Sequence, residues 1–247
     1  MRLMGIMMIK HTIILFASNG NNIGKTTTAK QLRGYLHNHF NNPKKELNEW
    51  KVINDHMTSV THTIYNNSFA DPIRKITKSL YDILFNDDRS YTFEGLYNQT
   101  YKNLPLSEVF GENKFKDYPE LKEKSIRDLV NDTSDQLQNV INENLWAGYA
   151  RRDIVFKSIN QNHEANDCIF IYDDFRRPLE YNYLKKNLDS KVYNIITIYL
   201  DKEGNKSQVN TSHEGQLTDF PFDIKFTFKE DYSNIDELFS KIKNLLH

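Results

Sequence analysis

Residues 13–29 read IILFASNGNNIGKTTTA, and this stretch predicts a strand, a short loop and a helix. The apolar run from Ile13 to Phe16 favours a buried strand. The small and amide residues that follow end at Gly24-Lys25-Thr26, where a segment of helical character continues to Tyr35. This order is typical of a phosphate-binding P-loop, in which backbone N–H groups and the helix dipole face an anion.

The lysine of a P-loop reaches the β- and γ-phosphates of a nucleotide, and the next hydroxyl ligates Mg²⁺. Asn19 stands where the usual pattern has its first glycine, but asparagine tolerates left-handed backbone better than most residues. The alternative is a strand, turn and helix in which Gly-Lys-Thr occurs by chance. We expect ATP to be bound by Asn21, Asn22, Ile23, Gly24, Lys25, Thr26 and Thr27, with Thr26 as the metal ligand.

Composition and charge exclude several classes of partner. The formal net charge of the 247 residues is −1, so no basic excess suggests nucleic-acid binding. No apolar run is long enough to span a bilayer, and the apolar start of the chain continues into the first strand, so we expect neither a membrane segment nor export. Cys168 is the one cysteine, which rules out an internal disulfide and suits a reducing cytoplasm.

Strand and helix patterns alternate along the chain, which predicts an α/β protein with a doubly wound parallel sheet. Ligands of such sheets bind at the carboxyl ends of the strands. The polar and aromatic segment 86–124 is expected to be an irregular or mobile insertion. Strands are expected at 11–18, 51–54, 59–65, 168–172 and 192–200, and helices at 25–36, 72–84, 125–140, 145–159, about 180–188 and 235–246.

Apolar residues at helical spacing predict the buried faces of two of these helices. Asp71 is the expected N-cap of the first, with Pro72 at the first helical position. Its expected buried stripe is Ile73, Ile76, Leu80, Ile83 and Leu84, and that of the helix after Ser125 is Ile126, Leu129, Val130, Leu137 and Val140.

A second charged group, Asp173-Asp174-Phe175-Arg176-Arg177, follows the apolar strand that ends at Tyr172. Both this group and the P-loop come directly after strands, so a parallel sheet would bring them to one edge. Arginine binds phosphate with two hydrogen bonds and keeps its charge. The group therefore predicts a second anion site, and the alternative is a surface ion-pair cluster that caps the next helix.

These stretches together resemble the bacteriophage-type deoxynucleoside monophosphate kinases, a family with the P-loop kinase fold. Gly24-Lys-Thr-Thr27 is similar to the family's P-loop, which commonly has Asp where this chain has Thr26. The segment from Ser68 to Arg74, SFADPIR, resembles the family's Phe-Ala-Asp-Pro-Leu-Lys. The segment from Asp174 to Glu180, DFRRPLE, resembles its Asp-Val-Arg-Phe-x-x-Glu motif.

Further landmarks of the family are matched less closely. Glu214-Gly-Gln-Leu217 is similar to a late Ser-Glu-x-x-Leu element, with His213 in place of the serine. Ser125-Ile-Arg127 and Leu145-Trp146 resemble the Pro-Arg and Leu/Phe-Trp landmarks of the acceptor half. The family's Gly-Thr after that arginine is missing, and Asp132-Thr-Ser134 stands near its place.

The resemblance implies a three-layer P-loop fold with a central parallel sheet and helical acceptor-binding and lid insertions. A single domain, 1–247, would have its core at about 11–36, 51–66, 168–200 and 223–247 and its acceptor-binding and lid region at about 67–165. ATP, Mg²⁺ and a deoxynucleoside 5′-monophosphate would be the ligands. The expected location is the cytoplasm, that of the host if the chain is phage-encoded, and a homodimer stays open.

The resemblance also implies roles for single residues. Arg127 and Arg176 would clamp the acceptor phosphate, and Asp174 would anchor Mg²⁺ through water or fix Arg176. Glu180 could accept a hydrogen bond from the sugar or base, and helix capping is its alternative. Trp146 could stack on the acceptor base, as could Phe69, and core packing is the alternative for both. Catalytic roles fall to Lys25, Arg127, Asp174 and Arg176, and acceptor binding to Phe69, Arg74, Arg127, Ser134, Trp146, Asp174, Arg176 and Glu180. Arg151 and Arg152 are candidates for lid arginines.

Two other functions stay open. A partitioning-type ATPase switch has a similar Gly-Lys-Thr-Thr, but Gly20 stands where those proteins carry a second lysine. A P-loop kinase for another small acceptor would need a carboxylate base near the acceptor hydroxyl. Asp55, Asp173 or Asp174 could supply that carboxylate.

Overall fold

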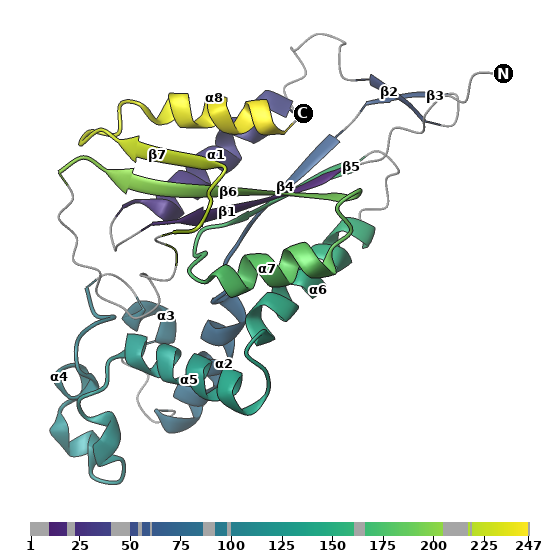
Figure 1. Ribbon diagram of the computed structural model, residues 1–247. Coiled ribbons are helices and arrows are strands. Elements are labelled where there is room, and N and C mark those ends of the chain that lie inside the picture. Colours follow the sequence, from purple (N-terminus) through teal and green to yellow (C-terminus); the bar gives the residue numbers. More distant parts are fainter. Residues whose placement is uncertain are drawn as a thin grey trace. The chain divides into compact units, whose positions relative to one another are not determined.

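Figure 1 presents the computed structural model of the chain, which describes residues 10–18, 23–40, 50–53, 56–59, 61–85, 92–97, 100–160, 166–204, 217 and 219–246. The chain forms two compact units. Unit 1 comprises Met1–Phe69 and Ala147–His247, and unit 2 comprises Ala70–Trp146. Unit 2 is therefore an insertion into the sequence of unit 1.

Unit 1 is built on a sheet of five parallel strands (Figure 1). In spatial order they are β4 (Thr61–Asn67), β5 (Asn166–Tyr172), β1 (His11–Ala17), β6 (Tyr193–Lys202) and β7 (Ile224–Phe228). A separate antiparallel pair consists of β2 (Trp50–Ile53) and β3 (His56–Ser59). The predicted α/β class and its parallel central sheet are confirmed.

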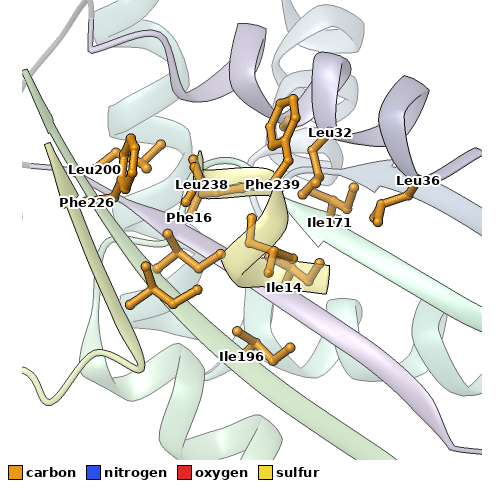
Figure 2. Packing of buried hydrophobic residues seen from close by; sticks show 14 of the residues in the cluster. Ile14, Phe16, Leu32, Leu36, Ile171, Ile196, Leu200, Phe226, Leu238 and Phe239 are labelled. Atoms are coloured by element: carbon orange, nitrogen blue, oxygen red, sulfur yellow. The ribbon is translucent and has the colours of Figure 1, made fainter. Parts of the chain in front are cut away.

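One face of the sheet is covered by α1 (Lys25–Phe40) and α8 (Ile235–Leu245). Ile14 and Phe16 alternate with their neighbours along β1 and meet Leu32 of α1 and Leu238 of α8 in one apolar cluster (Figure 2). All four side chains are fully buried. Burial of each contributes about 1.5–3 kcal/mol, so this cluster holds α1 and α8 against this face of the sheet.

The other face of the sheet is covered by α6 (Leu145–Asn160) and α7 (Pro178–Asn187). Ile13 and Leu15 of β1 point to this face, where they join Ile154 of α6 and Leu184 of α7. Residues of opposite parity along β1 therefore serve opposite clusters, as expected for a strand buried on both faces. None of the described helices is long and apolar enough to cross a membrane.

The connections that follow β1 and its neighbour β6 lead to opposite sides of the sheet. After β1 the chain passes through α1 and reaches β4 on one side, whereas after β6, the neighbour of β1, it passes to β7 on the other side. Adjacent strands whose connections leave in opposite directions open a crevice at their carboxyl ends, where ligands bind. The topology therefore predicts a ligand site at the carboxyl end of β1.

Unit 2 consists of helices around an apolar core of its own. Ser125 and Asp128 form a capping box at the start of the last helix, since each side chain accepts from the backbone N–H of the other. The elements are α2 (Asp71–Leu84), α3 (Phe93–Leu96), α4 (Leu106–Phe110), α5 (Ile126–Val140) and the 3₁₀ helices η1 (Glu112–Phe115) and η2 (Pro119–Leu121).

The expectation of an irregular insertion at 86–124 is only partly right for its described residues, 92–97 and 100–124. Short helices alternate with turns there, and Phe93, Leu96, Leu106 and Phe115 are buried in the core of unit 2. Helices of three to five residues are too short to show a periodic apolar pattern. The aromatic content of the segment was the signal of its core role.

The buried face of α2 also differs from the predicted stripe. The helix buries Pro72, Ile73, Thr77 and Tyr81, whereas Ile83 is 75% exposed. Thr77 can enter the core because its hydroxyl donates to the Ile73 carbonyl, at 3.0 Å. Of the other predicted members, Ile76, Leu80 and Leu84 are exposed.

Smaller corrections concern helix ends. Ala70 rather than Asp71 is the N-cap of α2, so the helix begins one residue earlier than predicted. Val140 is the last residue of α5 and is 79% exposed, although the stripe predicted it to be buried. Ile126 and Val130 are buried as predicted.

Candidate functional site

The junction between β1 and α1 places a lysine at a helix N-terminus. Lys25 is the first residue of α1, and its Nζ donates to Ser18 Oγ at the end of β1, at 2.5 Å. Gly24 before it has φ +81°, a left-handed conformation that favours glycine, and its carbonyl accepts from Thr28 N–H at 2.7 Å. Residues 19–22, including the predicted Asn21 and Asn22, lie outside the described residues.

The first turn of α1 has the groups that an anion needs. Its leading N–H groups lack partners within the helix, and the dipole favours negative charge there. No acidic residue lies in this turn, and Thr26 and Thr27 are exposed. Ile23 is buried in the cluster behind the sheet and anchors the end of the loop. An ammonium, N–H groups and hydroxyls fit phosphate, and a hydroxyl oxygen fits Mg²⁺.

The turn after β5 lies at the same sheet edge as Lys25. Phe175 N–H donates to the Phe16 carbonyl near the end of β1, at 3.1 Å, and Asp173 N–H donates to the Asn67 carbonyl at the end of β4, at 3.4 Å. These bonds carry the turn across the carboxyl ends of the sheet. The structure therefore brings the Asp174–Arg176 turn and Lys25 to one edge, within unit 1.

Asp174 ties this turn to the residues that follow β4. Its Oδ1 accepts from Phe69 N–H at 2.8 Å, and its Oδ2 accepts from the Ser68 hydroxyl. These bonds hold residues 68 and 69, and the two roles expected from the sequence, anchoring Mg²⁺ through water or fixing Arg176, stay predictions. Phe69 is the last residue before unit 2 begins. Asp174 therefore holds the point where the chain leaves unit 1.

Glu180 closes the N-terminus of α7. Its Oε2 accepts from the backbone N–H groups of Arg176, at 3.0 Å, and Arg177, at 3.2 Å. Burial raises the pKa of Glu180 to about 7, and the Asp174 charge adds to the rise while the two hydrogen bonds oppose it. The helix-capping alternative is thus the role that the contacts support, and a bond to a sugar or base stays a prediction.

Arg176 presents an uncommitted cation at this edge. Among the described residues its guanidinium forms no hydrogen bond or ion pair, while its backbone is held by Glu180. The side chain is half-buried. A guanidinium on a fixed backbone can bind a phosphate without first breaking a protein contact.

The predicted acceptor residues of unit 2 have protein contacts. Arg74 pairs with Asp71 and lies over the Tyr97 ring, at 5.8 Å from its centroid. Arg127 Nη1 lies 3.5 Å from Asn103 Oδ1, and its N–H donates to the Lys102 carbonyl at 3.1 Å. Both arginines lie in unit 2, whereas Lys25 and Arg176 lie in unit 1.

The two predicted stacking aromatics are core residues of their units. Trp146 is 6% exposed, and its Nε1–H donates to Ser134 Oγ at 2.9 Å, which connects α6 to α5. Phe69 is 4% exposed and its ring centroid lies 4.7 Å from that of Tyr172. Stacking on a base would require a ring face to be uncovered, so the structure supports packing roles for both.

Some residues of the site were not predicted, and some predicted ones lie elsewhere. Ser18 binds Lys25 and Ser68 binds Asp174, and neither contact could be predicted before the strand ends were placed. Tyr232, whose ring lies beside Gly24, belongs to no local motif that could have identified it. Of the lid candidates, Arg151 Nε donates to the Asn187 carbonyl at the end of α7, at 2.8 Å, and Arg152 is exposed. Asp55, His213 and Glu214 lie outside the described residues.

Comparison with known proteins adds no identification to this geometry. No known protein family matches the chain, and no curated protein matches it significantly.

Proposed function

We propose that the protein transfers the γ-phosphoryl group of ATP to a deoxynucleoside 5′-monophosphate, which yields the diphosphate and ADP. The observation that carries the proposal is the common sheet edge of Lys25 and the Arg176 turn, joined through the Phe175–Phe16 hydrogen bond. Two cationic groups at one edge suit a reaction in which two phosphates must approach each other. The edge also lies at the carboxyl ends of the parallel strands, where ligands of such sheets bind.

The donor half of the proposal assigns a P-loop to the junction between β1 and α1. Residues 21–27 would hold the ATP phosphates, with Lys25 on the β- and γ-phosphates and Thr26 on the metal. Mg²⁺ would neutralise phosphate charge as the transfer proceeds. The bond to Ser18 holds Lys25 Nζ at the end of β1, beside the N-terminus of α1 where the phosphates would bind.

The acceptor half assigns the second phosphate to Arg176, and roles for Arg127 and Arg74 rest on the resemblance to the kinase family alone. The acceptor phosphate is itself a competent nucleophile, so the chemistry needs no covalent enzyme intermediate. Catalysis then consists of positioning and charge neutralisation. The choice of a deoxynucleoside monophosphate rests on the resemblance of residues 68–74 and 174–180 to the kinase family. Such an enzyme would work in the cytoplasm.

The test is an ADP-release assay with ATP, Mg²⁺ and each nucleoside or deoxynucleoside monophosphate in turn. ADP production that depends strictly on one added monophosphate supports the kinase. Slow ATP hydrolysis at a rate that no added monophosphate changes contradicts the kinase and favours the partitioning-type ATPase. Turnover with nucleosides or other alcohols, but with none of the monophosphates, would favour the kinase for a different acceptor.

A further inference from the structure

Tyr232 has an unusual backbone conformation in the connection between β7 and α8. Its φ is +59°, and it is the one non-glycine residue with positive φ in the described part of the chain. A bulky side chain is rarely found there because its Cβ crowds the backbone. Strained residues of this kind persist only where the surrounding structure holds them, and they concentrate at functional sites.

The surrounding connection holds Tyr232 in this conformation. The Asn234 side chain accepts from Lys229 N–H and donates to the Thr227 carbonyl, both at 3.1 Å. Tyr232 N–H donates to the Lys229 carbonyl at 3.0 Å. Asp231 Oδ1 accepts from Ser233 N–H at 2.9 Å. Bonds on both sides of Tyr232 therefore keep the chain in a turn that determines where the ring lies.

The ring of Tyr232 lies beside the glycine that precedes Lys25, on the side where a side chain of that residue would begin. A Cβ added to Gly24 would lie 3.5 Å from both Cε1 and Oη of Tyr232. The Lys202 ammonium lies 4.3 Å from the ring centroid, and the Phe228 ring centroid lies 5.0 Å away. Gly24 is thus covered by a ring that is itself held by a cation–π contact and by the core.

We propose that Tyr232 is a positioning residue of the nucleotide loop, which braces Gly24 in its positive-φ conformation. Gly24 has no side chain and can leave φ +81° easily, and a ring beside it restricts that movement in addition to the bond from Thr28 N–H. Fixing it keeps the N–H groups of the loop end and Lys25 aimed at the phosphates before ATP binds. Preorganisation of this kind raises affinity because less conformational freedom is lost on binding. The inference rests on the proposed function.

The decisive variant is Tyr232→Asn, because asparagine adopts positive φ readily and therefore keeps the turn while it removes the ring. ATP–Mg²⁺ affinity, measured by calorimetric titration without acceptor, is expected to fall about tenfold. The KM for the acceptor is expected to stay within about twofold of the wild-type value, since the brace acts on the donor loop. Tyr232→Phe keeps the ring carbons against Gly24 and is expected to bind ATP nearly as well as the wild type.

Tyr35→Leu is the matched control. Tyr35 packs against the same apolar cluster, with its ring centroid 5.2 Å from that of Phe239, but it lies on the third turn of α1, away from Gly24. Its loss is expected to lower the unfolding midpoint without a change in ATP affinity. A role for Tyr232 in packing alone would give the same result as this control.

The possible outcomes distinguish a failure of the Tyr232 brace from a failure of the proposed function. If the wild-type chain binds no ATP, the proposed function fails. If the wild type binds ATP and Tyr232→Asn, shown to be folded by circular dichroism, binds it equally well, the brace is overturned and the function stands. If Tyr232→Asn does not fold, Tyr232→Phe and Tyr232→Leu decide: equal affinities of these two variants would also overturn the brace.

Discussion

Arg176 illustrates how a backbone can be fixed while its side chain is left available. Glu180 accepts from its N–H, and Phe175 beside it is bonded to β1. The guanidinium forms no bond among the described residues. Arg176 is therefore available to bind an anionic ligand without first breaking a protein contact.

The Arg176→Ala variant is therefore expected to fold normally and to lose function. We expect kcat/KM for the acceptor to fall by about a hundredfold or more, because a preorganised cation near the transferring phosphate is lost. The measurement is the acceptor-dependent release of ADP, with the unfolding midpoint recorded beside it. Lys186→Ala, which removes an exposed cation of α7 that has no assigned role, is the control. Full turnover and unchanged acceptor affinity in Arg176→Ala would show that the acceptor phosphate binds elsewhere.

Glu180 makes stability depend on pH. Its pKa in the folded protein is about 7, above the ordinary value of 4.5, because burial disfavours the charged form. The folded state therefore binds more protons than the unfolded state between these pKa values. The contribution of Glu180 to the free energy of unfolding is complete below pH 4.5 and is lost as pH rises through about 7.

Urea unfolding across this window checks the prediction. The free energy of unfolding of the wild type, relative to Glu180→Gln, is expected to fall between pH 4.5 and about 7. Glutamine keeps an oxygen that can accept from the two N–H groups, so the variant is expected to fold. Glu237→Gln, an exposed first-turn residue of α8, is the control. Parallel profiles of the wild type and Glu180→Gln would exclude this role.

Among the elements, strands were easier to predict than helix faces. The run from Ile13 to Phe16 is buried on both sides, so its position in the sheet follows from composition alone. A helix buries only one face, and in α2 two stripes compete. From Ile76 onward the predicted aliphatic stripe is exposed, and the helix instead buries Ile73 with Thr77 and Tyr81. Hydrophobicity favoured the first stripe, whereas the aromatic core of unit 2 selects the second.

The two faces of α2 give a direct test with an internal control. Ile73→Ala is expected to lower the free energy of unfolding by about 2–5 kcal/mol, because it leaves a cavity in the core of unit 2. Ile83→Ala makes the same chemical change on the exposed face and is expected to alter stability by about 0.5 kcal/mol or less. Equal losses for both variants, measured by urea unfolding, would mean that the Ile83 face is covered.

At the scale of the molecule, the sequence predicted only those residues of the candidate site that directly follow a strand. The Gly24-Lys25 and Asp174–Arg176 stretches each follow an apolar strand, so a parallel sheet had to bring them to one edge. Tyr232 follows the last strand without a motif, and its contact with Gly24 depends on tertiary structure. Trp146 was singled out by its resemblance to a family motif, and nothing in the sequence indicated that it is buried. Its core position could therefore not be distinguished from a role in base stacking.

The division of the chain into two units leads to a prediction about which ligand each variant affects. Lys25 belongs to unit 1, and Arg127 belongs to unit 2, where it contacts Asn103 and the Lys102 carbonyl. Under the proposed function, Arg127→Ala is expected to raise the KM of the acceptor about tenfold and to leave ATP affinity unchanged. Lys25→Met is expected to lower ATP-dependent turnover about a hundredfold or more and to leave acceptor binding intact.

Equilibrium dialysis with each ligand separately, beside steady-state kinetics, distinguishes these effects. Lys124→Ala is the matched control in unit 2, since its ammonium pairs with Asp132 at 2.8 Å on an exposed surface. If Arg127→Ala weakened ATP as much as the acceptor, the assignment of Arg127 to the acceptor would be wrong. Because Lys25 and Arg176 are both in unit 1, the donor phosphates and Arg176 would still share their sheet edge. The acceptor assignment would then rest on Arg176 alone.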